Sequence, residues 1–206
     1  VLYPADDHYE GKSLRLKQQY FLVSASLQNI INDHKHRYGP LSLLPQQAAI
    51  HINDTHPALA IPELMRLLMD ENGFTWDDAW NIVTSTFAYT NHTVMAEALE
   101  TWQEDLIARR LPRIHMILKE INRRFCNDLW ARFPGQHQFI ERMSVVSNGQ
   151  VRMANLSVIG SHKVNGVSAL HSDIIKNSIF NGFYQIWPEK FTNVTNGIAH
   201  RRWLCQ

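Results

Sequence analysis

The stretch Ile50-His51-Ile52-Asn53-Asp54-Thr55-His56-Pro57 changes abruptly from apolar to polar residues. Its first half predicts a short strand over residues 48–53. Pro57 favours the first position of a helix, because proline has no N–H to leave unpaired there and its φ angle already fits; the apolar spacing that follows predicts a helix over residues 57–71. Open α/β sheets bind ligands where a strand ends and a helix begins. The alternative is an ordinary polar turn with an Asp cap.

Three more segments end in the same way. Residues 87–93 run from apolar to polar through Asn91 and His92, and residues 94–100 after them have a helix-forming composition. Residues 162–168 and 191–198 are also strand-like and carry asparagines near their ends. Because several strand ends deliver amide and imidazole groups into loops, we expect them to share one crevice that suits a ligand covered in hydroxyl groups.

The rest of the chain alternates helix and strand. Apolar residues at spacings of three and four predict a helix over residues 12–35 and a long helical region from residue 102 to 129, which Pro112 kinks or restarts. Thr75 with Asp78 resembles a capping box that begins a helix ending near residue 86. Residues 153–159 fit either a strand or a helix. The alternation predicts an α/β fold with a largely parallel sheet flanked by helices.

Composition excludes several classes of protein. The chain has 206 residues, 45% of them hydrophobic and 19% charged, which is ordinary for a soluble globular protein. A net charge of +1 argues against a nucleic-acid-binding surface, and no apolar run is long enough to span a bilayer. The two cysteines fit a reducing, cytoplasmic compartment, and the 11 histidines follow no recognised metal-ligand pattern, so we assign no metal.

Taken together, the motifs resemble the α-glucan phosphorylases, the pyridoxal-phosphate-dependent enzymes that act on glycogen, starch and maltodextrin. The matching segments occur in the family's order along the whole chain: Glu10-Gly11-Lys12, Leu14-Arg15-Leu16-Lys17-Gln18, Asn53-Asp54-Thr55-His56-Pro57, Ile61-Pro62-Glu63-Leu64, Ala88-Tyr89-Thr90-Asn91-His92-Thr93, Val164-Asn165-Gly166-Val167, Leu170-His171-Ser172, Thr195-Asn196-Gly197-Ile198 and Arg201-Arg202-Trp203.

The resemblance implies a doubly wound, two-lobed fold of the GT-B type, of which residues 1–206 form a single partial domain at the end of the N-terminal lobe. The family's cofactor lysine lies in a glycine-rich motif of the C-terminal lobe, and the sequence contains no such motif. We therefore expect the cofactor lobe to be absent from this chain, and the chain alone to lack covalent pyridoxal phosphate and phosphorylase activity.

The resemblance also implies the reaction and the residues that serve it. Orthophosphate would cleave the terminal α-1,4-glucosidic bond and release glucose 1-phosphate with retained configuration, through a transition state resembling an oxocarbenium ion. His92 would have the central role, with its carbonyl facing the reacting carbon and its ring bonding the outer hydroxyl of the sugar. The other expected contacts are Asp54, His56, Asn91, Thr93, Ala98, Glu100, Val167 and Asn196 to substrate, and Trp203 to the cofactor.

Two other classes of function remain open from the sequence. One is a sugar-nucleotide-dependent glycosyltransferase of similar two-lobed fold, and the other is a non-catalytic carbohydrate-binding homologue. The resemblance implies glycogen or maltodextrin as partner, a homodimeric parent, and neither nucleic acid nor membrane. Asn32-Asp33 stands where animal glycogen phosphorylases have two arginines at their nucleotide-effector site. Because a carboxylate repels a phosphate, we expect no activation by AMP.

Overall fold

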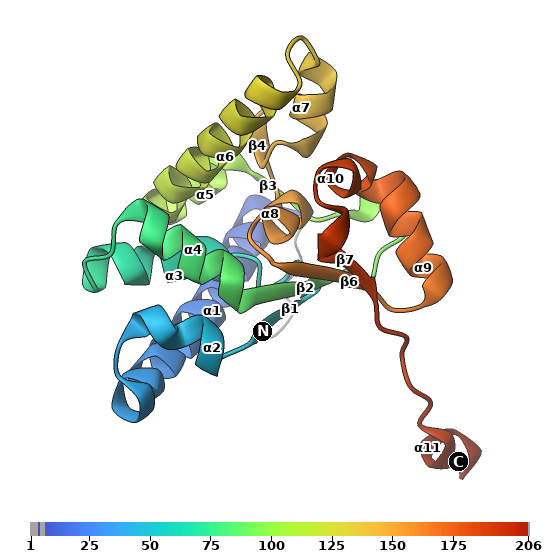
Figure 1. Ribbon diagram of the computed structural model, residues 1–206, viewed down its shortest axis with the longest axis horizontal. Coiled ribbons are helices and arrows are strands. Elements are labelled where there is room, and N and C mark those ends of the chain that lie inside the picture. The colour runs from blue at the N-terminus through green and yellow to red at the C-terminus, as the bar shows by residue number, and fades with distance from the viewer. Residues whose placement is uncertain (1–3, 5–6, 206) are drawn as a thin grey trace.

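The computed structural model describes Pro4 and residues 7–205. In Figure 1 a sheet crosses the middle of the molecule with helices on both sides. The α-helices are α1 Tyr9–Tyr38, α2 Leu44–Gln47, α3 Ala60–Arg66, α4 Trp76–Thr86, α5 Glu104–Arg110, α6 Pro112–Arg132, α7 His137–Met143, α8 Met153–Ile159, α9 Ala169–Ile174, α10 Asn181–Ile186 and α11 His200–Leu204. Short 3-10 segments occupy Leu41–Leu43, Ala96–Ala98 and Pro188–Lys190, and π-helical turns occupy Leu67–Glu71 and Ile175–Ile179.

The central sheet has four parallel strands in the order β1-β2-β6-β7. These strands are β1 Ile50–Asn53, β2 Phe87–Thr90, β6 Lys163–Gly166 and β7 Phe191–Asn193. In register, Asn53 lies beside Thr90 and Thr90 lies beside Asn165. Since the strands run in the same direction, their carboxyl ends meet at one edge of the sheet. The predicted α/β fold with a parallel sheet flanked by helices is confirmed.

A second, antiparallel sheet of three short strands has the order β3-β5-β4. Its strands are β3 Thr101–Gln103, β4 Val146–Ser147 and β5 Gln150–Arg152. Asn148 and Gly149 join β4 to β5 with φ angles of 53° and 70°, the left-handed conformations that a two-residue hairpin turn requires. Strands of two or three residues are too short for an alternating apolar pattern, so the sequence does not predict this sheet.

The helical expectation for residues 94–100 is wrong, because the structure has only a 3-10 turn at Ala96–Ala98. Val94 and Met95 remain 51% and 55% exposed, so the segment has no apolar face to bury. An isolated helix of that length is not stable in water without such packing, whatever its composition. The segment instead forms a loop that leads into β3.

Other boundaries follow the sequence more closely. The Thr75 hydroxyl oxygen accepts from the Asp78 N–H at 3.2 Å and caps α4 as expected. Pro112 begins α6 after a break at Leu111, which confirms that it restarts the helix. Residues 153–159 are helical. Pro57, however, is not the first residue of α3: it lies in a turn in which the Ala60 N–H donates to the Pro57 carbonyl, and the α-helix begins at Ala60.

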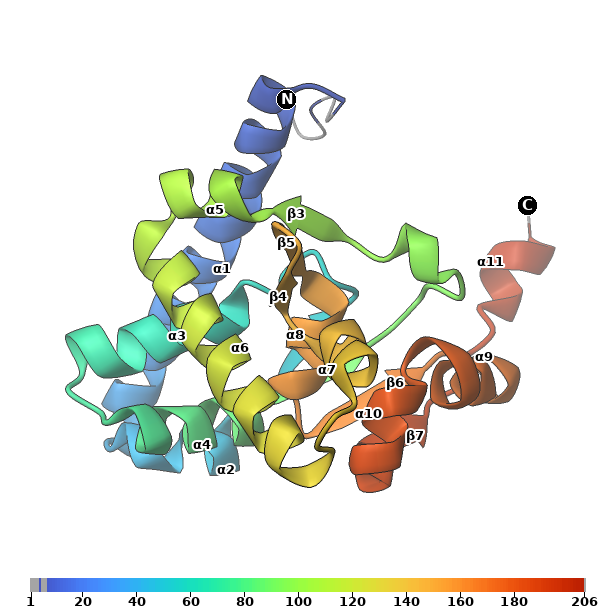
Figure 2. The same cartoon turned by 90° about the horizontal axis from the view of Figure 1, so that it is seen from above.

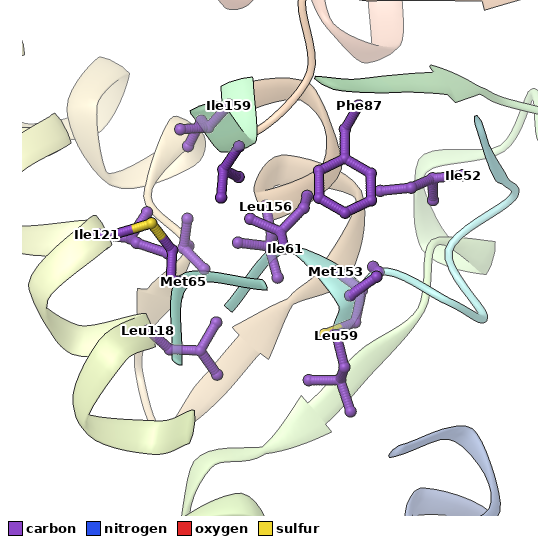
Figure 3. Packing of buried hydrophobic residues seen from close by; sticks show 14 of the residues in the cluster. Ile52, Leu59, Ile61, Met65, Phe87, Leu118, Ile121, Met153, Leu156 and Ile159 are labelled. Atoms are coloured by element: carbon purple, nitrogen blue, oxygen red, sulfur yellow. The ribbon is translucent and has the colours of Figure 1, made fainter. Parts of the chain in front are cut away.

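The apolar core lies between the central sheet and the helices α3, α6 and α8. Figure 3 shows Ile61 and Met65 of α3 among side chains from β1, β2, α6 and α8. Ile61 is fully buried, and a Cβ added to Gly160 would lie 2.6 Å from its Cδ1 atom. The chain therefore needs glycine at position 160, between α8 and β6, to let this part of the backbone approach α3.

A buried carboxylate fastens α1 to α3. Glu63 is 0% exposed, and its oxygens accept from Tyr20 Oη at 2.8 Å, Ser24 Oγ at 2.7 Å, and Arg66 Nε and Nη2 at 2.8 Å each. Burial, with the neighbouring Glu63 carboxylate, raises the pKa of Tyr20 to about 12. The Glu63 carboxylate raises the pKa of Arg66. This network fixes the position of α1, which carries Arg15 and Gln19 toward the sheet.

The carboxyl end of the described chain leaves the sheet. After β7 an extended segment leads to α11, which stands apart from the other helices in Figure 1 and projects beside α9 in the view of Figure 2. Across the described residues, no helix combines the length and apolar character needed to cross a membrane.

Candidate functional site

The carboxyl ends of the four parallel strands form a continuous polar edge. Past the strand ends, the Asp54 N–H donates to the Thr90 carbonyl at 2.9 Å, and the Asn91 N–H donates to the Asn165 carbonyl at 3.0 Å. The Asn196 N–H donates to the Val167 carbonyl at 3.0 Å. The backbone ladder thus extends into the loops and holds them beside one another. This edge is where an α/β sheet of this type binds ligands.

Side chains link the strands along the same edge. The Thr90 hydroxyl donates to Asn165 Oδ1 at 2.7 Å, and the Asn165 amide donates to the Gly166 carbonyl at 2.9 Å. His51 Nε2 contacts the Thr90 hydroxyl oxygen from the other side. Because that hydroxyl has only one hydrogen, which it gives to Asn165, His51 is the donor in this contact. These side-chain hydrogen bonds fix the strand ends relative to one another before any ligand binds.

His92 lies just beyond β2 with an exposed side chain. Its Nε2 lies 2.6 Å from Asn53 Oδ1, an atom that only accepts, so Nε2 carries the proton. No other described residue gives the ring a hydrogen-bond partner, which leaves Nδ1 as an acceptor directed away from Asn53. A neutral imidazole held in this way can accept a hydrogen bond from a ligand hydroxyl.

A cavity of about 320 Å³ opens beside these loops. Its walls include five residues that the sequence singled out: Asp54, His56, Thr93, Ala98 and Glu100. Arg15 of α1, Thr55 and Leu99 complete the lining. The volume is at the small end of the range for ligand pockets and suits a single compact polar ring. The lining contains two carboxylates, a guanidinium, an imidazole and two hydroxyls, groups that bond hydroxylated ligands.

Asp54 adopts a backbone conformation that side chains rarely take. Its φ is 63°, in the left-handed region, and its Oδ1 accepts from the Thr55 N–H at 2.6 Å. Aspartate tolerates this conformation because its short carboxylate bonds the adjacent backbone. The sharp turn directs the chain from β1 toward Pro57 and brings Asp54, Thr55 and His56 to the cavity wall. Such strained residues are common at ligand sites.

Glu100 is held in one position by three donors. Trp102 Nε1 donates at 2.6 Å, Thr55 Oγ1 at 3.2 Å and Gln19 Nε2 at 3.5 Å. The donors come from β3, from the loop after β1 and from α1. Glu100 therefore presents a fixed carboxylate to the cavity, with little freedom to turn away. A fixed acceptor suits a sugar hydroxyl, since no side-chain ordering is needed on binding.

Five of the predicted residues lie outside this cavity's lining. Asn91 is 0% exposed and its amide bonds only protein groups, so the structure gives it an internal position. Val167 and Asn196 lie in the loops after β6 and β7, and His92 is exposed in the loop after β2. They share the sheet edge with Asp54. Trp203 is on α11, with 61% of its surface exposed and away from the sheet.

A larger cavity of about 610 Å³ lies at the opposite edge of the sheet. Its lining includes residues directly before β2 and β6, namely Thr84, Ser85, Ser161 and His162. The faces of two of its indole rings are covered by protein cations: Arg124 lies 5.0 Å from the Trp76 ring and Lys190 lies 4.0 Å from the Trp187 ring. We therefore place the candidate site at the smaller, more polar cavity.

Three groups important to the site were not expected as site residues. Arg15 was visible only as part of the Leu14-Arg15-Leu16 motif, and nothing in helical spacing shows that it reaches a cavity 40 residues further along the chain. Thr55 appeared only within the Asn53-Asp54-Thr55-His56-Pro57 motif, yet its hydroxyl bonds Glu100. His171 appeared only within the Leu170-His171-Ser172 motif, although it contacts the loop that contains His92. No group of three or more His, Cys, Asp or Glu side chains arranged for a metal occurs among the described residues.

The chain forms a parallel α/β sheet with a polar cavity at its carboxyl edge, and comparison with known families identifies the family to which it belongs. Residues 1–206 match the family model described as carbohydrate phosphorylase, so the chain belongs to the carbohydrate phosphorylase family.

Its relatives include glycogen phosphorylase of Bacillus subtilis (strain 168), 53% identical over 203 residues that make up 98% of this chain and 25% of the relative. Glycogen phosphorylase of Haemophilus influenzae is 52% identical over 207 residues, 99% of this chain and 25% of the relative. The muscle form of glycogen phosphorylase from Homo sapiens is 51% identical over 215 residues, 99% of this chain and 26% of the relative. The chain thus spans about a quarter of the length of these relatives.

Proposed function

We propose that the protein containing this chain is an α-glucan phosphorylase. Orthophosphate attacks the terminal α-1,4-glucosidic bond of glycogen or a maltodextrin and releases glucose 1-phosphate. Membership of the carbohydrate phosphorylase family supports this proposal. The main structural support is that one cavity at the sheet edge is lined by five of the expected residues, Asp54, His56, Thr93, Ala98 and Glu100.

This chain supplies the sugar side of the reaction. His92 Nδ1 accepts from the outer hydroxyl of the terminal glucosyl unit, because Asn53 already takes the proton on Nε2. The His92 carbonyl faces the reacting carbon and stabilises the positive charge that develops there, without having to reorient. Asn196 bonds the same hydroxymethyl end, and Val167 packs against the sugar face. Asp54 and Glu100 accept from ring hydroxyls beside that unit.

Pyridoxal phosphate, when bound, supplies a phosphate group for proton transfer and charge stabilisation opposite the sugar. Trp203 is the residue of this chain that reaches it in the proposal. Its side chain is 61% exposed on a helix that stands apart from the sheet, which fits a contact with a further part of a longer protein rather than a cofactor pocket within residues 1–206. Residues 1–206 then form part of one lobe, and the cofactor lysine belongs to the other.

The proposal also covers the setting of the enzyme. The whole protein acts in the cytoplasm as a homodimer on a soluble polysaccharide, and it requires neither nucleic acid nor a membrane. Residues 1–206 alone catalyse no phosphorolysis, since the cofactor lysine lies outside them.

Substitution of His92 in the full-length protein tests the proposal. The wild type should release glucose 1-phosphate from maltodextrin only when orthophosphate is present. His92→Ala should lower kcat/KM by about 10²-fold or more, the typical effect of losing one fixed group that stabilises transition-state charge or position. His36→Ala is the matched control, because His36 is exposed near the end of α1 and should leave the rate unchanged.

Three outcomes would contradict the proposal. Unchanged release by His92→Ala would remove the role of His92. Glucan binding by the wild type with no release would indicate a non-catalytic homologue. Glucan extension from a sugar nucleotide, without any requirement for phosphate, would indicate a glycosyltransferase of another class.

A further inference from the structure

A buried histidine joins the loops after β2 and β6, at the edge of the sheet that carries the candidate site. His171 lies in the first turn of α9 and is 6% exposed. The Ser168 hydroxyl oxygen accepts from its backbone N–H at 3.1 Å, which places its ring behind the loop after β6. From there the ring reaches the loop after β2, 80 residues earlier in the sequence.

The hydrogen bonds of His171 define which nitrogen carries the proton. The Val167 N–H donates to Nδ1 at 3.2 Å, so Nδ1 is unprotonated. A neutral imidazole then has its proton on Nε2. This Nε2–H faces Asn91 Oδ1 at 3.1 Å and the Thr93 carbonyl at 3.3 Å. His171 thus accepts from the loop after β6 and donates to the loop after β2.

Asn91 connects the His171 ring to the peptide between His92 and Thr93. Its Oδ1 also accepts from the Thr93 N–H at 3.0 Å, and its amide donates to Tyr89 Oη at 3.1 Å. The Thr93 N–H belongs to the same planar peptide unit as the His92 carbonyl, and the two point in opposite directions. Fixing the N–H direction therefore fixes the carbonyl direction.

We propose that His171 is a positioning residue for phosphorolysis: by donating to Asn91 Oδ1 it orients the peptide between His92 and Thr93, and so aims the His92 carbonyl at the reacting carbon. The inference rests on the proposed function of His92. The same inference gives Asn91 a role in orienting this peptide, since the Asn91 side chain is fully buried. Through its bond with the Val167 N–H, the same ring also holds the loop after β6.

Two substitutions of similar size separate the two ends of the ring. In His171→Gln the side-chain amide reaches the position of Nε2 and can still donate to Asn91. In His171→Asn the amide oxygen takes the position of Nδ1 and can still accept from Val167, but the donor to Asn91 is lost. If His171 only fills space or only stabilises the fold, the two variants should behave alike.

Kinetics of the full-length protein with maltodextrin and orthophosphate test the inference. We expect His171→Asn to lower kcat by about 10- to 100-fold with a much smaller change in KM, because a misaimed carbonyl affects the transition state more than ground-state binding. His171→Gln should stay within about threefold of wild type in kcat, by the same reasoning. Equal losses in the two variants of an active wild type would overturn the inference.

Hydrogen exchange gives a readout that does not depend on activity. The backbone amide of Thr93 should exchange faster in His171→Asn than in wild type, and at the wild-type rate in His171→Gln. Unchanged exchange in both variants would also overturn the inference. A wild type that exchanges as expected but performs no phosphorolysis would instead contradict the proposed function, so the two failures are distinguishable.

Discussion

Replacing Glu63 by glutamine tests whether a buried carboxylate holds α1 in place. Glu63 is 0% exposed and its two oxygens accept four hydrogen bonds, two of them from Arg66. Glutamine has the same shape but offers only one accepting oxygen. Its NH2 group would face either Arg66 Nε–H or Nη2–H, both of which only donate. The substitution thus leaves a mostly buried guanidinium facing a donor.

The structure sets the size of the effect. Breaking a buried ion pair by removing one partner costs about 3–5 kcal/mol. The Arg66 side chain is 20% exposed and keeps a 2.8 Å contact with Glu71, so the lower end, about 3 kcal/mol, applies. Native-state hydrogen exchange of the α3 amides in the full-length protein measures it. A loss of that size raises exchange rates by about 10²-fold.

Glu71→Gln is the matched control. It makes the same chemical change to the other carboxylate that contacts Arg66, but the Glu71 side chain is 50% exposed. Exposed ion pairs contribute about 0–1 kcal/mol, so exchange of the α3 amides should rise less than about tenfold. If the two variants shift exchange equally, the buried carboxylate does not fasten α1 and the reasoning is refuted.

Other substitutions have equally definite outcomes. Burial lowers the pKa of Lys190 to about 8, so between pH 8 and its ordinary value of 10.5 the unfolded chain binds more protons than the folded chain. The Tm of wild type relative to that of Lys190→Met should therefore rise with pH across that window. A Tm difference that stays constant with pH would contradict this prediction. Gly160→Ala should lower stability by about 1–3 kcal/mol because its Cβ would meet Ile61 at 2.6 Å, whereas Gly197→Ala, with nothing within 4 Å, should change unfolding measurably less. AMP should leave the proposed phosphorolysis rate of the full-length protein unchanged, because Asp33 would face the nucleotide phosphate. An AMP-dependent increase in initial rate would show that expectation to be wrong.

Local signals in the sequence predicted where helices and strands occur better than they predicted which elements pack against one another. Strand β1 and its polar end, the Thr75 cap and the restart at Pro112 all depend on residues a few positions apart, and the structure contains each of them. Residues 94–100 show the limit of composition: good helix formers make no helix where no apolar face can be buried. The hairpin of β4 and β5 was not predicted, because its strands of two and three residues are too short for an alternating pattern.

The site was predictable only as a set of residues at strand ends. That Asp54 and Glu100 line one cavity follows from the pairing of β1 with β2 and from the bond between Thr55 and Glu100, 45 residues apart. The contribution of His171 depends on a contact across 80 residues. No periodicity encodes such a contact, because it arises from how β6 and α9 pack against β2.

Strand β1 bonds a neighbour on one side only within the described chain, since it stands at the end of the order β1-β2-β6-β7. On its open side, the backbone N–H and C=O groups of Ile50–Asn53 that point away from β2 can accept another extended segment. We expect soluble preparations of residues 1–206 to run as dimers or larger species, and a proline at an outward-facing position of β1 to restore the monomer.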